Sequence, residues 1–191
     1  MKTAERKIKR LGVGLCALLA GVLLSGCGPE EEVEGPDPVT DFEVSRYMGK
    51  WYEIARLENR FERGLTEISA EYTLREDGSV KVLNRGFAKA KGKWKEAEGK
   101  ALFIGDSDVA DLKVSFFGPF YGGYRVFGLD QKGYQWAYIT GPGRKYLWLL
   151  ARSPKVSDAR KKHFVETAKA LGYDTDALVW VEHGEVKRLF R

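Results

Sequence analysis

Residue types that commonly perform catalysis are sparse in this sequence. The 191 residues contain two histidines, His163 and His183, and two cysteines, Cys16 and Cys27. No serine, histidine and aspartate stand out in the order of a hydrolytic triad, and no metal-ligand spacing stands out. We therefore expect a protein that is not an enzyme and that uses neither a metal ion nor a cofactor.

The residues before Cys27 predict that its thiol carries a lipid. Five basic residues precede an uncharged apolar run, residues 11–24, which is shorter than the ~20 residues that span a bilayer. Leu24, Ser25, Gly26 and Cys27 resemble the bacterial lipobox, which implies a diacylglycerol thioether on Cys27 and cleavage before it. The alternative is an ordinary signal peptide with an incidental cysteine. Gly28 stands where aspartate would resemble an inner-membrane retention signal, so we expect the cell outer membrane, with the domain facing the periplasm.

Cleavage at this point changes the charge of the chain. The full sequence has a formal net charge of +5, but five basic residues and one acidic residue lie within residues 1–26. The mature chain is close to neutral, which gives no support for nucleic-acid binding. The predicted organisation is a signal peptide (1–26), a lipidated cysteine with an acidic Pro/Gly tether (27–38), one domain (39–185) and a basic tail (186–191).

The sequence of the domain predicts an all-β fold, because short runs of alternating polarity are separated by turn residues. Asp77 and Gly78 are a strong hairpin signal between two of these runs. The expected strands are residues 50–56, 66–74, 79–87, 93–104, 110–117, 121–129, 135–140 and 145–152. Eight strands with short connections suit an up-and-down antiparallel β-barrel, because closure removes the exposed edges.

One C-terminal helix is expected after the strands. Ser157 is a suitable N-cap, Phe164, Ala168 and Leu171 form an apolar stripe, and Gly172 suits a C-terminal cap. The stripe predicts packing against the outside of the barrel. Residues 178–181 are expected to add a short ninth strand.

Several motifs resemble the lipocalin family. Gly49, Lys50 and Trp51 at the first strand and residues 149–152 (Leu-Leu-Ala-Arg) at the eighth look like two signature regions of that family. Residues 51–56, 60–64, 113–124 and 146–152 are similar to the bacterial lipocalins, which are outer-membrane lipoproteins. The family's second signature, a Thr-Asp-Tyr turn, is only partly present at Leu129 and Asp130. The resemblance covers residues 39–181 and implies a lipocalin barrel.

The resemblance also implies structural roles for the signature residues Gly49, Trp51, Asp130 and Arg152. Trp51 would plug the closed end of the barrel, with the Arg152 guanidinium across its indole and bonded to nearby backbone carbonyls. A minority interpretation makes Arg152 a carboxylate binder.

Strand alternation, counted from Arg152, gives a largely apolar inner face that suits a fatty or amphiphilic ligand. The predicted cavity residues are Ile68, Ala70, Tyr72, Val82, Asn84, Phe103, Leu112, Val114, Phe116, Tyr124, Tyr146, Trp148 and Leu150. The small residues Ala70, Gly99, Ala101 and Gly128 are also expected to point inward, which favours space over a filled interior. Glu53 and Glu98 are the acidic residues expected inside.

The predicted function is binding of fatty acids or lysophospholipids for lipid storage or transport in envelope maintenance under stress. Aromatic residues at 116–121, with Arg60, Arg63, Arg144 and Lys145 in or beside the loops of the expected open end, suit docking on a phospholipid surface. The alternative is a buried aromatic hairpin with solvated loop charges, and the aromatic residues could equally serve a homodimer contact. The alternative function is an envelope structural or assembly lipoprotein with a filled barrel and a protein-binding aromatic rim.

Overall fold

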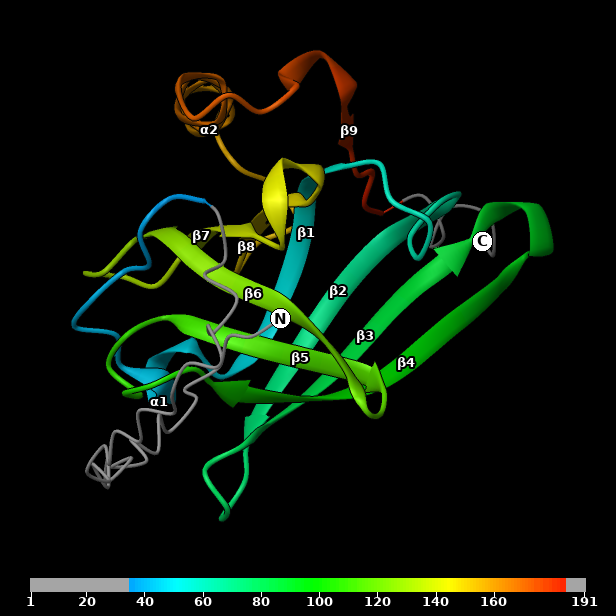
Figure 1. Ribbon diagram of the computed structural model, residues 1–191. Helices are drawn as coiled ribbons and strands as arrows, with labels where there is room; N and C mark the ends of the chain where they lie inside the picture. The colour runs from blue at the N-terminus through cyan, green and yellow to red at the C-terminus, as the bar shows by residue number, and fades with distance from the viewer. Residues whose placement is uncertain (1–34, 185–191) are drawn as a thin grey trace, which may run out of the picture. The chain divides into compact units, whose positions relative to one another are not determined.

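The computed structural model describes residues 35–184, which form an antiparallel barrel (Figure 1). The strands are β1 (Gly49–Leu57), β2 (Leu65–Leu74), β3 (Val80–Ala88), β4 (Lys93–Phe103), β5 (Asp111–Phe117), β6 (Phe120–Leu129), β7 (Trp136–Thr140), β8 (Leu147–Ala151) and β9 (Leu178–Trp180). Neighbours follow the sequence order from β2 to β8, and β1 pairs with both β8 and β2. The predicted eight-stranded up-and-down barrel is therefore confirmed. Cys27, the signal peptide and the basic tail lie outside the described residues.

The C-terminal helix α2 (Asp158–Ala170) lies outside the barrel, as the apolar stripe predicts (Figure 1). The Ser157 hydroxyl accepts a hydrogen bond from the Arg160 backbone N–H at 3.2 Å and so caps its first turn. Phe164 and Ala168 are completely buried against the barrel wall. Gly172 follows the helix with φ of +81°, a conformation that favours glycine.

Strand β8 is buried on two faces, one inside the barrel and one beneath α2. On β8, Leu150 belongs to the inner core, whereas Leu147 and Leu149 pack in the outer core with Phe164. Because successive side chains of a strand point to opposite faces, one short strand supplies both cores. This explains the near-continuous apolar sequence of β8.

The two ends of the barrel differ. The short helix α1 (Val44–Tyr47) lies at the end that holds the β4–β5 and β6–β7 connections: the Phe42 N–H donates to the Asp108 carbonyl, and the Arg46 guanidinium donates to the Gln131 carbonyl. In an up-and-down barrel, alternate connections share an end, so the β1–β2, β3–β4, β5–β6 and β7–β8 connections lie opposite (Figure 1). The 3₁₀ turns Lys89–Lys91 and Gly143–Lys145 belong to that second end, and Thr175–Ala177 precedes β9.

The chain beyond α2 returns to the barrel wall through β9. This strand pairs antiparallel with the end of β1, with Ala55 opposite Trp180. Past β9, the Glu182 carbonyl accepts hydrogen bonds from the Glu67 N–H at 3.1 Å and from the Thr66 hydroxyl at 2.8 Å. The expected ninth strand is present, and it fastens the C-terminal segment across β1 and β2.

Candidate ligand cavity

A tryptophan closes the α1 end of the barrel. Trp51 is completely buried, and its indole N–H donates to the Tyr47 carbonyl at 2.8 Å. The Arg152 guanidinium carbon lies 4.0 Å from the centre of the indole ring. This is the stacked cation–π geometry that the sequence predicts for this pair.

The same guanidinium joins three segments of backbone. It donates to the carbonyls of Arg46 at 2.7 Å, Lys50 at 2.9 Å and Tyr134 at 3.3 Å. Three of its five N–H donors are engaged in this way, all with backbone carbonyls, which supports the structural role of Arg152.

Gly49 and Asp130 shape the backbone at this end. Gly49 has φ of +88°, in the left-handed region that favours glycine, directly before the strand that carries Trp51. The Asp130 carboxylate accepts from the N–H groups of Gly133 at 3.2 Å and Gln135 at 3.3 Å. The β6–β7 turn is therefore held by its aspartate.

A cavity of about 120 Å³ lies inside the barrel. Every predicted cavity residue except Tyr146 lines it. Its other lining residues are Phe42, Val44, Tyr47, Met48, Glu53, Glu62, Ser69, Val80, Ala101, Gly123 and Ile139. The wall is mostly aliphatic and aromatic. The presence of the cavity shows that side chains do not fill the barrel completely.

Tyr146 does not line the cavity. It precedes β8 rather than belonging to it, and its ring stacks on Trp148 with centroids 5.8 Å apart and planes 17° from parallel. Tyr146 therefore stacks on a lining residue from beyond the end of the strand, and does not line the cavity itself.

Two other inward assignments are wrong. Glu98 is half-exposed on the outer face and pairs with Lys81 at 2.9 Å. A side chain at Gly128 would meet the outward-facing Tyr138 ring at 2.7 Å, because a bulge between Val126 and Gly128 reverses the alternation.

Gly99 makes room for a neighbour rather than for a ligand. A Cβ there would lie 2.9 Å from the ring of Phe116. Phe116 thus occupies the space that the small residue leaves.

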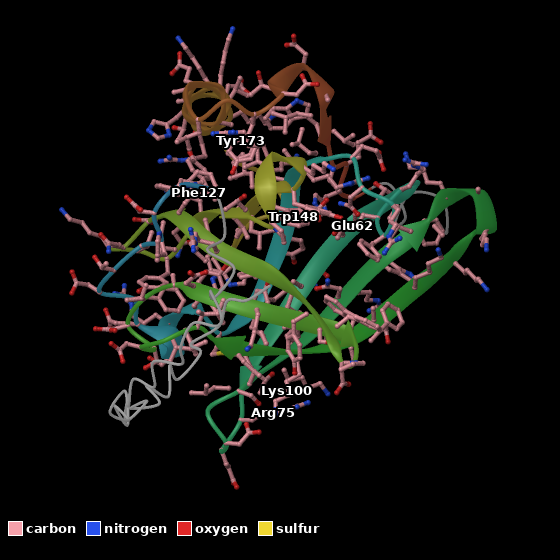
Figure 2. All side chains as sticks on the ribbon, viewed as in Figure 1. Glu62, Arg75, Lys100, Phe127, Trp148 and Tyr173 are labelled. Carbon is pink, nitrogen blue, oxygen red and sulfur yellow. The ribbon has the colours of Figure 1, made fainter. Side chains whose placement is uncertain are left out.

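Alternation within strands could not reveal the lining residues of α1 and of the β1–β2 loop. Val44, Tyr47 and Met48 come from α1 and its end, and their spacing of three and four residues was the available signal. Glu62 comes from the loop and points toward Trp148 (Figure 2).

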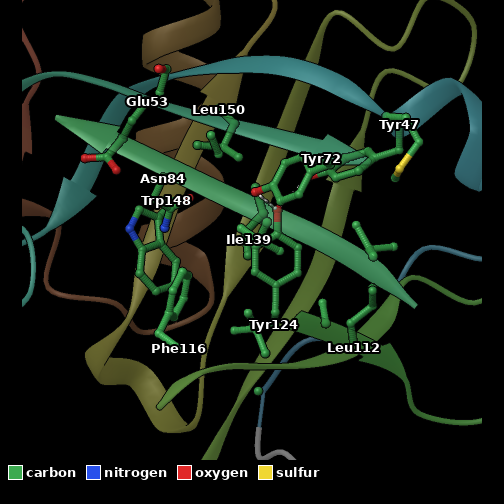
Figure 3. A pocket seen from close by; sticks show the side chains of 18 of the residues that line it. Tyr47, Glu53, Tyr72, Asn84, Leu112, Phe116, Tyr124, Ile139, Trp148 and Leu150 are labelled. Atoms are coloured by element: carbon green, nitrogen blue, oxygen red, sulfur yellow. Dashed lines mark hydrogen bonds between the residues drawn. The ribbon is translucent and has the colours of Figure 1, made fainter. Parts of the chain in front are cut away.

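A cluster of tyrosine hydroxyls lies in the part of the cavity nearer α1. The hydroxyl of Tyr124 is 2.7 Å from that of Tyr47 and 2.9 Å from that of Tyr72 (Figure 3). Burial raises the pKa of all three phenols, so they remain protonated at neutral pH.

Glu53 and Glu62 form a second polar region of the lining, and Glu53 lies away from the tyrosines in Figure 3. Glu53 is buried and accepts from the Arg56 guanidinium at 3.0 Å. Glu62 accepts from the indole N–H of Trp148 at 3.1 Å and from the Asn59 amide. Burial raises the pKa of the Glu53 carboxyl well above its usual value, and the adjacent Glu62 raises it further, against the effect of Arg56.

The end opposite α1 exposes aromatic rings. Phe117 and Phe120, at the tip of the β5–β6 hairpin, are 72% and 79% exposed, and Phe61 in the β1–β2 loop is also exposed. Cations accompany them: the Arg60 guanidinium lies 4.7 Å from the Phe61 ring centre, and the Lys113 ammonium lies 5.6 Å from that of Tyr121. We call Phe61, Phe117, Phe120 and Tyr121 the aromatic rim.

Within residues 35–184, no helix combines the length and apolarity needed to cross a membrane. The same residues hold no group of three or more histidine, cysteine, aspartate or glutamate side chains placed to bind a metal ion.

Comparison with known proteins decides the family. The sequence model of the family described as the lipocalin-like domain matches residues 42–183 of this chain. The chain belongs to the lipocalin family. The lipocalin is 52% identical to the outer membrane lipoprotein Blc of Vibrio cholerae, over 86% of this chain and 95% of that protein. It is 45% identical to the protein of the same name from Escherichia coli K12, over 88% of this chain and 94% of that protein.

A solved structure supports the same fold for the lipocalin. Insecticyanin from the tobacco hornworm Manduca sexta superposes with a TM-score of 0.63, over 78% of this chain and 85% of that chain. The two sequences are 23% identical, so the likeness concerns the barrel alone.

Proposed function

We propose that this lipocalin binds fatty acids or lysophospholipids inside the barrel and stores or carries them at the cell outer membrane, for envelope maintenance under stress. The observation that carries the proposal is the cavity, whose wall is mostly aliphatic and aromatic. Burial of an acyl chain there gains ~0.8 kcal/mol per CH₂ group.

The small volume of the cavity favours a slim ligand. Its volume of about 120 Å³ is below the roughly 300–1,000 Å³ of typical small-molecule sites. Phe116 and Trp148 are half-buried in its wall, and their movement would admit a longer chain. A flexible acyl chain fits such a space better than a rigid ring system.

The membrane location rests on the sequence and on the relatives. The residues up to Cys27 have the pattern of a lipoprotein signal. Two relatives at 45% and 52% identity are named outer membrane lipoproteins. We propose that Cys27 carries the lipid anchor and that the barrel faces the periplasm.

The alternative of a structural or assembly lipoprotein requires a filled barrel, and the cavity argues against it. The aromatic rim fits a membrane, a protein partner or a second copy of the chain, so a homodimer remains a prediction. We propose lipid carriage as the function and no catalysis.

Native mass spectrometry of the anchor-free domain tests the proposal. A chain that begins at Gly28 keeps residues 35–184, which contain every residue of the cavity. We expect this protein, purified from bacteria, to carry about one fatty acid or lysophospholipid per chain. An empty protein that also rejects added fatty acids and lysophospholipids would favour the alternative.

A pair of neighbouring substitutions localises the ligand. Val114 lines the cavity, whereas Lys113 is exposed on the outer face of the same strand. We expect Val114→Arg to remove the bound lipid and Lys113→Ala to retain it, with thermal unfolding confirming that both variants are folded. Equal lipid content in the two variants would place the ligand elsewhere.

A further inference from the structure

Three buried hydroxyl groups meet inside the cavity from three separate elements. Tyr47 lies on α1, Tyr72 on β2 and Tyr124 on β6, and all three line the cavity. Tyr124 is the middle member, with hydroxyl-to-hydroxyl distances of 2.7 Å to Tyr47 and 2.9 Å to Tyr72 (Figure 3). Tyr47 and Tyr72 are 3% and 6% exposed.

The three tyrosine hydroxyls have more protons to donate than hydrogen bonds between them. Three phenols carry three hydroxyl protons, and each hydroxyl-to-hydroxyl contact uses one of them. The chain has two contacts, and within residues 35–184 these hydroxyls make no other hydrogen bond. Whichever way the hydroxyls turn, one buried O–H donor is left without an acceptor.

The cavity wall beside the tyrosines is apolar. Leu112 and Ile139 lie beside the tyrosines in the cavity wall (Figure 3). The carboxyls of Glu53 and Glu62 belong to the other polar region and bond to Arg56, Trp148 and Asn59. A saturated hydrocarbon chain packed against the tyrosines would leave the donor unpaired, which is unfavourable for a buried polar group.

We propose that the three tyrosines form a hydrogen-bonding site for a neutral oxygen atom carried on the ligand, so that the cavity prefers oxygen-substituted acyl chains, such as keto or hydroxy acyl chains, to saturated ones. The inference rests on the proposed function, because it concerns the same cavity and a lipid ligand. It adds the class of ligand that the part of the cavity nearer α1 selects.

The charged residues of the cavity wall favour a neutral ligand oxygen over a carboxylate at the tyrosines. Lysine, arginine and histidine are absent from the residues that line the cavity, whereas Glu53 and Glu62 are among them. A carboxylate at the tyrosines would have no cation in the wall to pair with, because Arg152, whose charge acts on Tyr47 and Tyr72, donates to backbone carbonyls instead. A ketone or hydroxyl oxygen accepts the hydrogen bond without that penalty.

A series of ketostearates that differ only in the position of the ketone tests the proposal. Displacement of a fluorescent fatty acid from the anchor-free domain would give each affinity relative to stearate. We expect one position, or two adjacent positions, to bind about tenfold tighter than stearate, which is the effect of one net hydrogen bond. The C=O stretch of that bound ketone should move to lower frequency, as it does on accepting a hydrogen bond.

Replacement of the hydroxyls supplies the second test. The triple variant Tyr47→Phe, Tyr72→Phe, Tyr124→Phe should lose the ketone preference and the frequency shift while still binding stearate. Tyr47→Phe alone leaves two hydroxyls and one contact, hence one free donor, and should keep part of the preference. Tyr173→Phe is the matched control, because this buried tyrosine donates to the Thr140 hydroxyl at 2.8 Å and does not line the cavity.

The outcomes separate this inference from the proposed function. If stearate binds and no ketone position improves on it, the tyrosine site is wrong while lipid carriage stands. A preference that persists in the triple variant also overturns the site. Failure of stearate and of every ketone to bind overturns both proposals. If the triple variant does not fold, the ketone series and the C=O frequency of the native protein decide the question.

Discussion

Arg152 shows how one side chain secures the closed end of the barrel. Its guanidinium covers the indole of Trp51 and bonds to carbonyls of three backbone segments, around Arg46, Lys50 and Tyr134. Lysine would keep the charge but not the planar fork that reaches several acceptors at once.

Arg152→Lys is therefore expected to destabilise the fold. Loss of charged hydrogen bonds and of the stacked contact should lower the free energy of unfolding by about 2 kcal/mol. Urea unfolding measures this change. Lys155→Ala, at an exposed position beyond β8, should change stability by less than about 0.5 kcal/mol. Equal stability of Arg152→Lys and the native chain would refute the assigned role.

The buried carboxyl group of Glu53 is expected to make the protein less stable as the pH rises. Its folded-state pKa is raised, chiefly by burial and next by Glu62, whereas the unfolded value is about 4.3. The folded protein thus holds a proton that the unfolded chain has lost. The stabilisation is complete below the unfolded pKa and is lost as the pH rises through the folded one.

The groups that face Glu53 come from several elements. Arg56 and Glu62 contact its side chain, Tyr72 interacts with it across the cavity, and His183 bonds to its backbone carbonyl at 2.7 Å. We expect Glu53→Gln to flatten the decrease in unfolding free energy above about pH 5, measured by urea unfolding at successive pH values. Glu96→Gln, at an exposed position on β4, should keep the native slope. A native slope in Glu53→Gln would contradict the prediction.

At the scale of elements, α2 supports the barrel from outside without touching the cavity. Phe164 packs in the outer core with Leu147 and Leu149, and the stacked rings of Phe127 and Tyr173 lie on the same side (Figure 2). The cavity is lined instead by the inner face of the strands and by α1. Stability and ligand affinity are therefore separable on opposite faces of one wall.

Phe164→Ala tests this separation. Removal of a completely buried aromatic ring should cost about 3–5 kcal/mol of unfolding free energy. The lipid affinity of the folded fraction should stay within about twofold of the native value, because the ring lies outside the cavity. Calorimetric binding at low temperature, together with urea unfolding, measures both quantities. A large loss of affinity with little loss of stability would contradict the separation.

At the scale of the whole molecule, the two barrel ends are chemically different. One end is closed by Trp51, Arg152 and α1, and the other exposes the aromatic rim beside Arg60 and Lys113. Exposed rings with neighbouring cations suit the interface of a phospholipid bilayer. A lipid entering from a membrane would thus meet the rim before the cavity.

A double substitution in the rim tests this orientation. Phe117→Ser with Phe120→Ser should weaken binding of the anchor-free domain to phospholipid vesicles by about tenfold, because two apolar rings no longer enter the interface. Cosedimentation measures the binding. Leu74→Ser, also at an exposed apolar residue but on the β2–β3 side, should have little effect. Equal effects of the two changes would exclude a role for the rim, and a change from dimer to monomer would assign it to self-association.

Most of the fold could be predicted from the sequence because strand alternation and turn residues act locally. The inner faces of β2 and β5 follow directly from alternation, as Ile68, Tyr72, Leu112 and Val114 show. Prediction failed where the backbone departs from regular pairing. The bulge at Gly128 reverses the faces, and β8 begins only after Tyr146. A bulge leaves no dependable mark in the polarity of a sequence.

The sequence by itself determined the strand order, the outer helix, the resemblance to lipocalins and the apolar character of the inner wall, because each depends on residues close together in the chain. Only the tertiary structure brought Tyr47, Tyr72 and Tyr124 together, and it alone set Glu62 beside Trp148. These residues are 25 to 86 positions apart, and their contacts depend on barrel closure and on how α1 and a loop fold over its ends. Closure thus turned separate polar side chains in an apolar wall into specific hydrogen-bonding groups.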